Sequence, residues 1–293
     1  MADDERAERC HKDRVVYGVN GQSLGAVVNA ILLQQAKPHP SPGRENRKMK
    51  QSGVVLPHGA ERVVPALGID VHVWRVALDA PLSRSDMAML NPAELTRGGR
   101  FVFEQDQRRH LAAHAGLRRV LSMYTGRAPG ELDLRETPQG KPFLADGRLA
   151  FNLSHSGELA LVAVAAAGQV GVDVERVASR SGEMSIARSL FAPGEIAQLE
   201  SLAPEARRLM FCRLWTCREA VLKATGVGLS GVGLEIGMDG SGEAYIFSPP
   251  LELVEPLGLI EFRPSAHHVA AVAWSARGSQ AVARRFDFDL GLP

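Results

Sequence analysis

Two carboxylates interrupt a run of valines in the stretch QVGVDVERV, residues 169–177. In a β-strand alternate side chains point to the same face, so Asp173 and Glu175 share one face while the valines share the other. Two carboxylates on neighbouring positions of one face have Cα atoms roughly 7 Å apart and repel each other unless a cation or a proton lies between them. The pair therefore indicates a bound metal ion, and the alternative is a strand face that is simply solvated.

A further acid and a lysine lie one helical turn apart in WTCREAVLKATG, residues 215–226. Glu219 and Lys223 are at positions i and i+4, so they share one face of the predicted helix. An isolated pair of this kind is usually a surface ion pair. The helix is apolar enough to be a core element, however, and the segment after it, residues 226–234, is rich in glycine, which allows the backbone to approach a ligand closely.

Serine hydroxyls and an imidazole gather in LAFNLSHSGEL, residues 149–159. The sequence predicts a strand that runs into a turn, with His155 at its tip and Ser154 beside it. These groups together with backbone amides can bind a phosphate or an oxyanion. The alternative is an ordinary solvated loop histidine.

Two cations upstream add to this set of possible phosphate ligands. Lys141 lies between Gly140 and Pro142, in a turn that is rigid enough to fix the stem of its side chain. Arg109 lies near the start of a predicted helix, where the helix dipole adds to the attraction for an anion. Taken singly, each of these residues also has the plain interpretation of an exposed surface charge.

The elements that carry these residues suggest an internal duplication. Helical periodicity predicts long helices over 106–126 and 205–226, and a shift of one hundred residues brings the Thr-Gly pair that ends the first onto the pair that ends the second. We predict an α+β fold of two similar halves, 63–168 and 169–290, each with one long helix followed by antiparallel strands. A ligand is then expected in the groove between the halves. Residues 1–62 include a proline-rich basic stretch and are predicted to be a disordered leader.

Composition limits the class of protein. The chain has 293 residues, of which 45% are hydrophobic and 23% charged, so it can bury a sizeable core. A formal net charge of +1 argues against a protein that coats nucleic acid. Three cysteines without finger spacing indicate a reducing compartment. The N-terminus lacks the layout of a signal peptide, and no apolar run reaches membrane-spanning length, so we expect a soluble, cytoplasmic protein.

The order of these motifs along the chain resembles one enzyme family. Arg109 is followed by GKP at 140–142, FNLSHSG at 151–157, GVDVE at 171–175 and WTCREAVLK at 215–223. This series is similar to the 4′-phosphopantetheinyl transferases of the Sfp type, which are monomeric pseudo-dimers, and the resemblance covers roughly residues 67–286. One departure is Arg218, at a position where many members have lysine.

The resemblance implies transfer of the phosphopantetheine arm of coenzyme A to a serine of an apo acyl or peptidyl carrier protein, with release of 3′,5′-ADP. It implies that Asp173, Glu175 and Glu219 hold one Mg²⁺, and that Glu175, Glu219 and Lys223 act in catalysis. The implied ligands of coenzyme A are Arg109, Lys141, Pro142, Ser154, His155, Asp173 and Lys223. The alternatives are a non-catalytic module of the same fold that binds coenzyme A or a carrier protein, and an unrelated metal-dependent phosphohydrolase.

Overall fold

The structure is a computed structural model that describes residues 17–18, 22–23, 70–178, 182–227, 233–250, 256–275 and 282–288. The chain divides into two compact units, Met1–Gly53 and Val54–Pro293. In the first unit β1 (Tyr17–Gly18) pairs with β2 (Gln22–Ser23) in antiparallel fashion. The predicted leader 1–62 otherwise lies outside the described residues. The rest of the fold belongs to the second unit.

A four-stranded sheet forms the first half of this unit. Its strands are β3 (Asp70–Ala77), β6 (Ala150–Ser156), β7 (Leu159–Ala165) and β13 (Val282–Phe288), in the order β13-β3-β7-β6. β13 pairs with β3 in parallel, and the other pairs are antiparallel. The long helix α5 (Glu104–Thr125) buries one face against this sheet, because Ala112, Leu117 and Val120 share a core with Val76.

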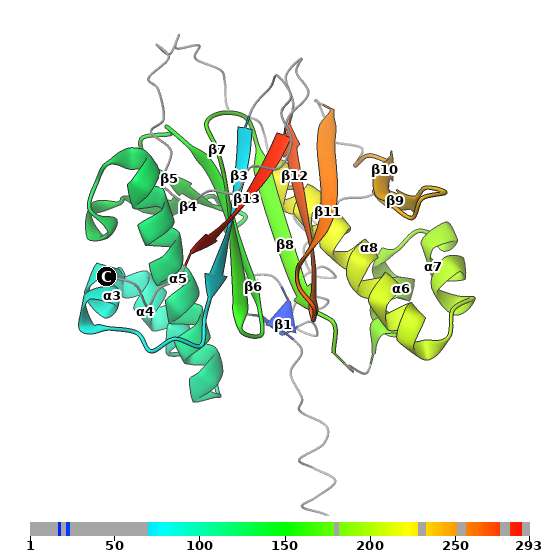
Figure 1. Cartoon of the computed structure of the whole chain (residues 1–293), viewed down its shortest axis with the longest axis horizontal. Coiled ribbons are helices and arrows are strands. Elements are labelled where there is room, and N and C mark those ends of the chain that lie inside the picture. The colour runs from blue at the N-terminus through cyan, green and yellow to red at the C-terminus, as the bar shows by residue number, and fades with distance from the viewer. Residues whose placement is uncertain are drawn as a thin grey trace, which may run out of the picture. The chain divides into compact units, whose positions relative to one another are not determined.

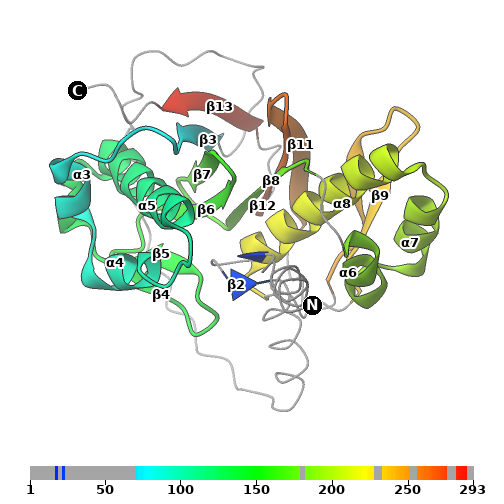
Figure 2. The same cartoon turned by 90° about the horizontal axis from the view of Figure 1, so that it is seen from below.

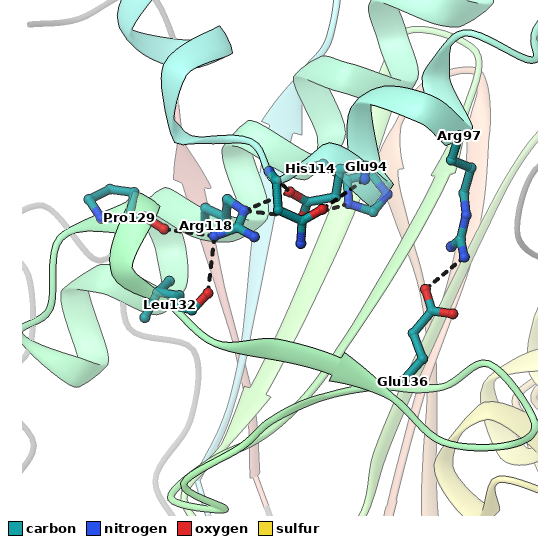
Figure 3. Close-up of polar contacts among 8 residues, drawn as sticks. Glu94, Arg97, His114, Arg118, Pro129, Leu132 and Glu136 are labelled. Atoms are coloured by element: carbon teal, nitrogen blue, oxygen red, sulfur yellow. Dashed lines mark hydrogen bonds and ion pairs between the residues drawn. The ribbon is translucent and has the colours of Figure 1, made fainter.

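Short elements around α5 fix its position. Helices α3 (Arg84–Met89) and α4 (Pro92–Gly98) both begin with a capping box. In the second box Glu94 also accepts a hydrogen bond from the buried guanidinium of Arg118, which donates in turn to the backbone carbonyls of Pro129 and Leu132 (Figure 3). This network joins α4 and α5 to the 3-10 helix η2 (Pro129–Glu131). The hairpin β4 (Leu134–Glu136) and β5 (Pro142–Leu144) follows η2.

The second half repeats this plan. β8 (Val170–Arg176), β11 (Leu257–Ser265) and β12 (His268–Ser275) form a sheet in the order β11-β12-β8. Three helices accompany it, namely α6 (Glu183–Leu190), α7 (Pro193–Glu200) and α8 (Pro204–Thr225). A separate hairpin consists of β9 (Glu235–Met238) and β10 (Ala244–Ser248). In Figures 1 and 2, α3, α4 and α5 form one group, α6, α7 and α8 form another, and the strands of the four-stranded and three-stranded sheets lie between them.

The two long helices correspond closely. Each has 22 residues, and their first residues, Glu104 and Pro204, are one hundred positions apart. Each ends at a glycine with left-handed backbone angles, Gly126 at φ 69° and Gly226 at φ 74°. The prediction of an α+β fold with two similar halves is therefore confirmed.

A shared apolar core joins the halves. The valine face of β8, with Val172 and Val174, packs in one cluster with Val71 and Val73 of β3 and with Leu161 of β7. The opposite face of the β3–β7 sheet packs on α5 in a different cluster. The strands are therefore buried on both sides, which explains why β7 and β12 are apolar along most of their length.

Candidate active site

Side chains of β6 continue the hydrogen bonding of β8 across the junction of the two halves. The amides of Val172, Val174 and Arg176 donate to the side chains of Asn152 (2.9 Å), Ser154 (3.4 Å) and Ser156 (3.1 Å), respectively. The strand runs into a turn as predicted, but the turn comes only at residues 157–158, because residues 150–156 are strand throughout. Asparagine and serine, which usually signal turns, serve here as a ladder of short acceptors on one face of a strand.

The acids of β8 lie on the face that α8 covers. Asp173 is 4% exposed, and Glu175 is half-buried. A Cβ atom on Gly171, the next residue on this face, would lie 2.2 Å from the carbonyl oxygen of Ala220, so strand and helix are in backbone contact. The alternative of a solvated strand face was therefore wrong for Asp173.

Serines of the ladder also contact both acids. The hydroxyl of Ser154 donates to Oδ1 of Asp173 (2.8 Å), and that of Ser156 donates to Oε2 of Glu175 (3.0 Å). Each serine thus accepts from one β8 amide and donates to the carboxylate before it in the strand. This double use fixes the rotamers of both acids, and Ser156 was not among the predicted site residues.

Lys223 is inserted between the two halves. Its Nζ donates to Oδ1 of Asp173 at 2.6 Å and to the hydroxyl of Ser154 at 3.2 Å. Burial lowers the pKa of this ammonium group, but attraction to Asp173 and Glu219 outweighs burial, so the pKa lies above its ordinary value. The lysine is charged, and its partner is a β8 carboxylate rather than a solvent-exposed neighbour on its own helix.

Glu219 is enclosed at the same place, with 1% of its surface exposed. Burial raises its pKa to about 8; Lys223 acts in the opposite direction, and the negative charges of Asp173 and Glu175 reinforce the effect of burial. These mutual effects mean that the three carboxylates, which are distant in the sequence, share one electrostatic environment. A carboxylate in such a position is stabilised either by a proton or by a cation.

The donor set fits a divalent ion only in part. Oδ2 of Asp173 and Oε1 of Glu219 are buried without a hydrogen-bond partner, and such oxygens are suitable ligands for a hard cation. Among the described residues, however, no three His, Cys, Asp or Glu side chains are placed to form a metal centre by themselves. Mg²⁺ usually binds through one or two carboxylates, with substrate phosphates and water completing its octahedron. The two unpartnered oxygens match that pattern, whereas a complete three-acid cage is not present.

His155 lies within β6 and is half-buried, so its predicted place at a loop tip was wrong. Burial, together with the nearby charges of His114 and Lys223, lowers the pKa of His155 to about 4. The imidazole is therefore neutral near pH 7 and can donate one hydrogen bond without adding charge. Its ring lies 6.0 Å from that of His110, a buried histidine of α5 that was not predicted.

The two outer cations already have partners. Arg109 makes a two-pronged ion pair with Asp79, with Nε and an Nη at 2.7 and 3.0 Å from the carboxylate oxygens. Lys141 is half-buried, and burial lowers its pKa to about 8. Its Nζ donates to backbone carbonyls of α8 and β8, and the next residue, Pro142, begins β5. Lys141 is therefore not an exposed turn lysine.

A buried ion pair supports the α8 side of the site. Arg218, which precedes Glu219, donates to Oε2 of Glu195 at 2.6 Å and lies over the ring of Phe191, 5.0 Å from its centre. Glu195 also accepts from the amide of Ile236 (3.2 Å), so one carboxylate joins α7, α8 and β9. A proline followed by glutamate near a helix start, residues 193–195, was the available signal for this cap.

Comparison with known proteins decides the family. A family model described as the 4′-phosphopantetheinyl transferase superfamily matches residues 169–246, and one for the N-terminal region of 4′-phosphopantetheinyl transferases matches residues 82–167. The 4′-phosphopantetheinyl transferase HetI of Nostoc sp. is 39% identical over 221 residues, which cover 73% of this chain and 91% of that protein. The chain belongs to the 4′-phosphopantetheinyl transferase family. The junction of the two halves, where both matched regions of this transferase meet, also brings together Ser154, Asp173, Glu219 and Lys223.

Two other relatives are similar to the transferase over a shorter length. A 4′-phosphopantetheinyl transferase of Bacillus subtilis is 29% identical over 163 residues, or 54% of this chain and 71% of that protein. The 4′-phosphopantetheinyl transferase AcpT of Escherichia coli (strain K12) is 35% identical over 143 residues, or 48% of this chain and 70% of that protein.

Within the described part of the transferase, no helix has the length and apolar character that a membrane span requires.

A cavity of about 270 Å³ lies beyond the end of β8, between Arg208 of α8 and Arg263 and His268 of the β11–β12 hairpin. None of the predicted site residues lines this cavity.

Proposed function

We propose that the chain transfers the 4′-phosphopantetheine arm of coenzyme A to a serine hydroxyl of an apo carrier protein and releases 3′,5′-ADP. The observation that carries this proposal is the contact of Lys223 with the buried Asp173 and Ser154, beside the buried Glu219, in a chain of this family. The reaction forms a bond between the serine oxygen and the β-phosphorus of coenzyme A and breaks the bond from that phosphorus to the bridging oxygen. The hydroxyl proton passes to a base, and the bond electrons remain on 3′,5′-ADP.

Mg²⁺ is the proposed cofactor, with Asp173 and Glu219 as the residues that would hold it directly and Glu175 as the third acid that the family resemblance adds. The two unpartnered oxygens on Asp173 and Glu219 support this assignment. When bound, such an ion neutralises charge on the diphosphate and orients it. Because Glu219 resists ionisation when no cation is near, it also suits a site whose charge is completed by ligand binding.

Lys223 is the proposed stabiliser of the leaving diphosphate. Its ammonium group is charged and held by Asp173 and Ser154, so a phosphate oxygen at this point meets a preoriented donor. Glu175, which Ser156 holds in place, and Glu219 are the two candidate acceptors of the serine proton. The transfer would be direct or pass through one water, which is the reach that general-base catalysis requires.

The remaining coenzyme A ligands are proposed from the family resemblance, namely Arg109, Pro142, Ser154 and His155. Arg109 has to exchange its exposed partner Asp79 for a phosphate, and this exchange is easy because 59% of the Asp79 side chain is in solvent. His155, neutral near pH 7, would donate a single hydrogen bond. We further propose the Sfp subtype, a monomeric state, a cytoplasmic location and acyl or peptidyl carrier domains as partners.

The test is the intact mass of an apo carrier protein after incubation with the purified chain, coenzyme A and Mg²⁺. We expect a mass gain of one phosphopantetheine arm, stoichiometric release of 3′,5′-ADP and loss of both with Glu219→Gln. Glu243→Gln, a change at an exposed acid of the β9–β10 turn, is the matched control and should keep full activity. Binding of coenzyme A with no transfer to any of a panel of carriers would instead favour the non-catalytic module, and release of free phosphopantetheine without a carrier would favour a hydrolase.

A further inference from the structure

The ammonium group of Lys141 is fully occupied by the backbone of the other half of the molecule. Nζ donates to the carbonyl oxygens of Lys223 (2.6 Å), Ala224 (2.9 Å) and Val170 (3.3 Å). An ammonium group has three hydrogens, so these three acceptors use its whole donor capacity. The Cδ atom of the stem lies 4.0 Å from the Cβ position of Gly226, the residue that ends α8.

The carbonyls of Lys223 and Ala224 lie in the last turn of α8, where they need a hydrogen-bond donor from outside the helix. The last four carbonyls of an α-helix have no amide within the helix to accept from, and the helix dipole places partial negative charge there. The carbonyl of Leu222 accepts a hydrogen bond from the amide of Gly226, and the Nζ of Lys141 donates to the carbonyls of Lys223 and Ala224. A lysine at a helix C-terminus can therefore act as a cap supplied by a distant part of the chain.

The hairpin holds the backbone of Lys141 firmly. Its amide donates to the hydroxyl of Thr137 (3.1 Å), and its carbonyl accepts from the amide of Thr137 (2.9 Å). Gly140, just before it, has φ of 81°, which keeps the turn between β4 and β5 tight. The stem of the lysine thus starts from a fixed point on the first half and ends on the second.

The capped carbonyls belong to the segments that carry the reacting groups. One is the carbonyl of Lys223 itself, and Val170 begins the strand in which Asp173 lies three residues later. We propose that Lys141 is a positioning residue: it caps α8, ties it to β8, and so holds the Lys223 side chain against Asp173, and its ammonium group is not a ligand of the coenzyme A 3′-phosphate. This inference rests on the proposed function, and it replaces the role that family resemblance gives Lys141.

Paired substrates separate the two roles. Lys141→Met and Lys141→Arg are compared with the unchanged protein, each with coenzyme A and with 3′-dephospho-coenzyme A, which lacks the phosphate in question. If Lys141 is a positioning residue, Lys141→Met lowers kcat by about tenfold or more with both substrates, relative to the unchanged protein. The ratio of the kcat/KM values for the two substrates then changes by less than about twofold. A loss seen mainly as raised KM for coenzyme A, and absent with the dephospho form, would overturn the proposal.

Hydrogen exchange gives a readout that needs no activity. Removing the cap should speed exchange of the amides in the last turn of α8, residues 222–226, by about tenfold, while Arg135→Met, on the exposed face of the same hairpin, leaves it unchanged. Unchanged exchange in both Lys141 variants would overturn the proposal. Lys141→Arg keeps a charged donor and is the variant to use if Lys141→Met does not fold. If the unchanged protein transfers nothing, the proposed function fails, and the exchange result still decides the role of Lys141.

Discussion

Gly171→Ala tests the backbone contact on which the geometry of the site depends. The added Cβ would lie 2.2 Å from the carbonyl oxygen of Ala220, 2.3 Å from the amide nitrogen of Ala224 and 2.8 Å from the carbonyl carbon of Lys223. Real Cβ atoms essentially never approach other atoms closer than 3.0 Å. All three neighbours are backbone atoms, so no side chain can rotate away. Helix α8 must therefore move from β8 by about 0.8 Å, the difference between 3.0 and 2.2 Å.

A shift of α8 by this amount disrupts contacts in the site more than it destabilises the fold. The Nζ of Lys223 is 2.6 Å from Oδ1 of Asp173, and a displacement of this size lengthens the contact beyond good hydrogen-bonding distance. Misplacement of catalytic groups by about 1 Å lowers activity by about a hundredfold. Overpacking of a close interface costs about 1–3 kcal/mol of unfolding free energy. We therefore expect a folded protein whose transfer rate falls far more than its stability.

The assay is kcat for transfer to an apo carrier, with urea unfolding of the same preparation. Gly240→Ala is the matched control, because a Cβ there meets no atom within 4 Å and should change neither quantity. If Gly171→Ala keeps at least about half of the original kcat, the close contact of α8 with β8 is not what positions Lys223, and the reasoning is refuted.

Three further predictions concern stability. Asn152→Ala leaves the buried amide of Val172 without its acceptor and should lower the unfolding free energy in urea by about 1–3 kcal/mol; a change no larger than that of an exposed alanine substitution would contradict the side-chain ladder. Glu195→Ala leaves the buried charge of Arg218 without its ion-pair partner and should lower the unfolding free energy in urea by about 3–5 kcal/mol. The control is Glu200→Ala, which removes an exposed ion pair instead. In metal-free buffer, stability should fall as pH rises from the ordinary pKa of glutamate, 4.5, to about 8, because folded Glu219 keeps a proton that the unfolded chain has lost; Glu219→Gln should flatten this part of the profile, and an equal slope in both proteins would show that Glu219 is not the group responsible.

The sequence was sufficient for the elements with strong local signals. Helical periodicity and a terminal glycine predicted α5 and α8, and alternation in QVGVDVERV predicted that Asp173 and Glu175 share a face of β8. The correspondence of the two helices across one hundred residues also identified the repeated plan of the fold. Because these features depend on residues near one another in the chain, local sequence patterns are enough to predict them.

Other features depend on partners that are distant in the sequence. Asn152, Ser154 and Ser156 are typical of turns, and only the approach of β8 turns them into a ladder of acceptors. Their spacing at alternate positions, with Leu153 and His155 between them, was the available signal for a strand. Lys141 shows the same limit, because two of its three acceptors belong to a helix about eighty residues later, and no local pattern predicts that contact.

Anomalous diffraction from crystals grown with coenzyme A and Mn²⁺, as a substitute for Mg²⁺, tests the central claim most directly. We predict one peak at the junction of the halves, next to Oδ2 of Asp173 and Oε1 of Glu219. Coenzyme A bound at that junction with no peak between these carboxylates, or a peak at another place, would contradict the account.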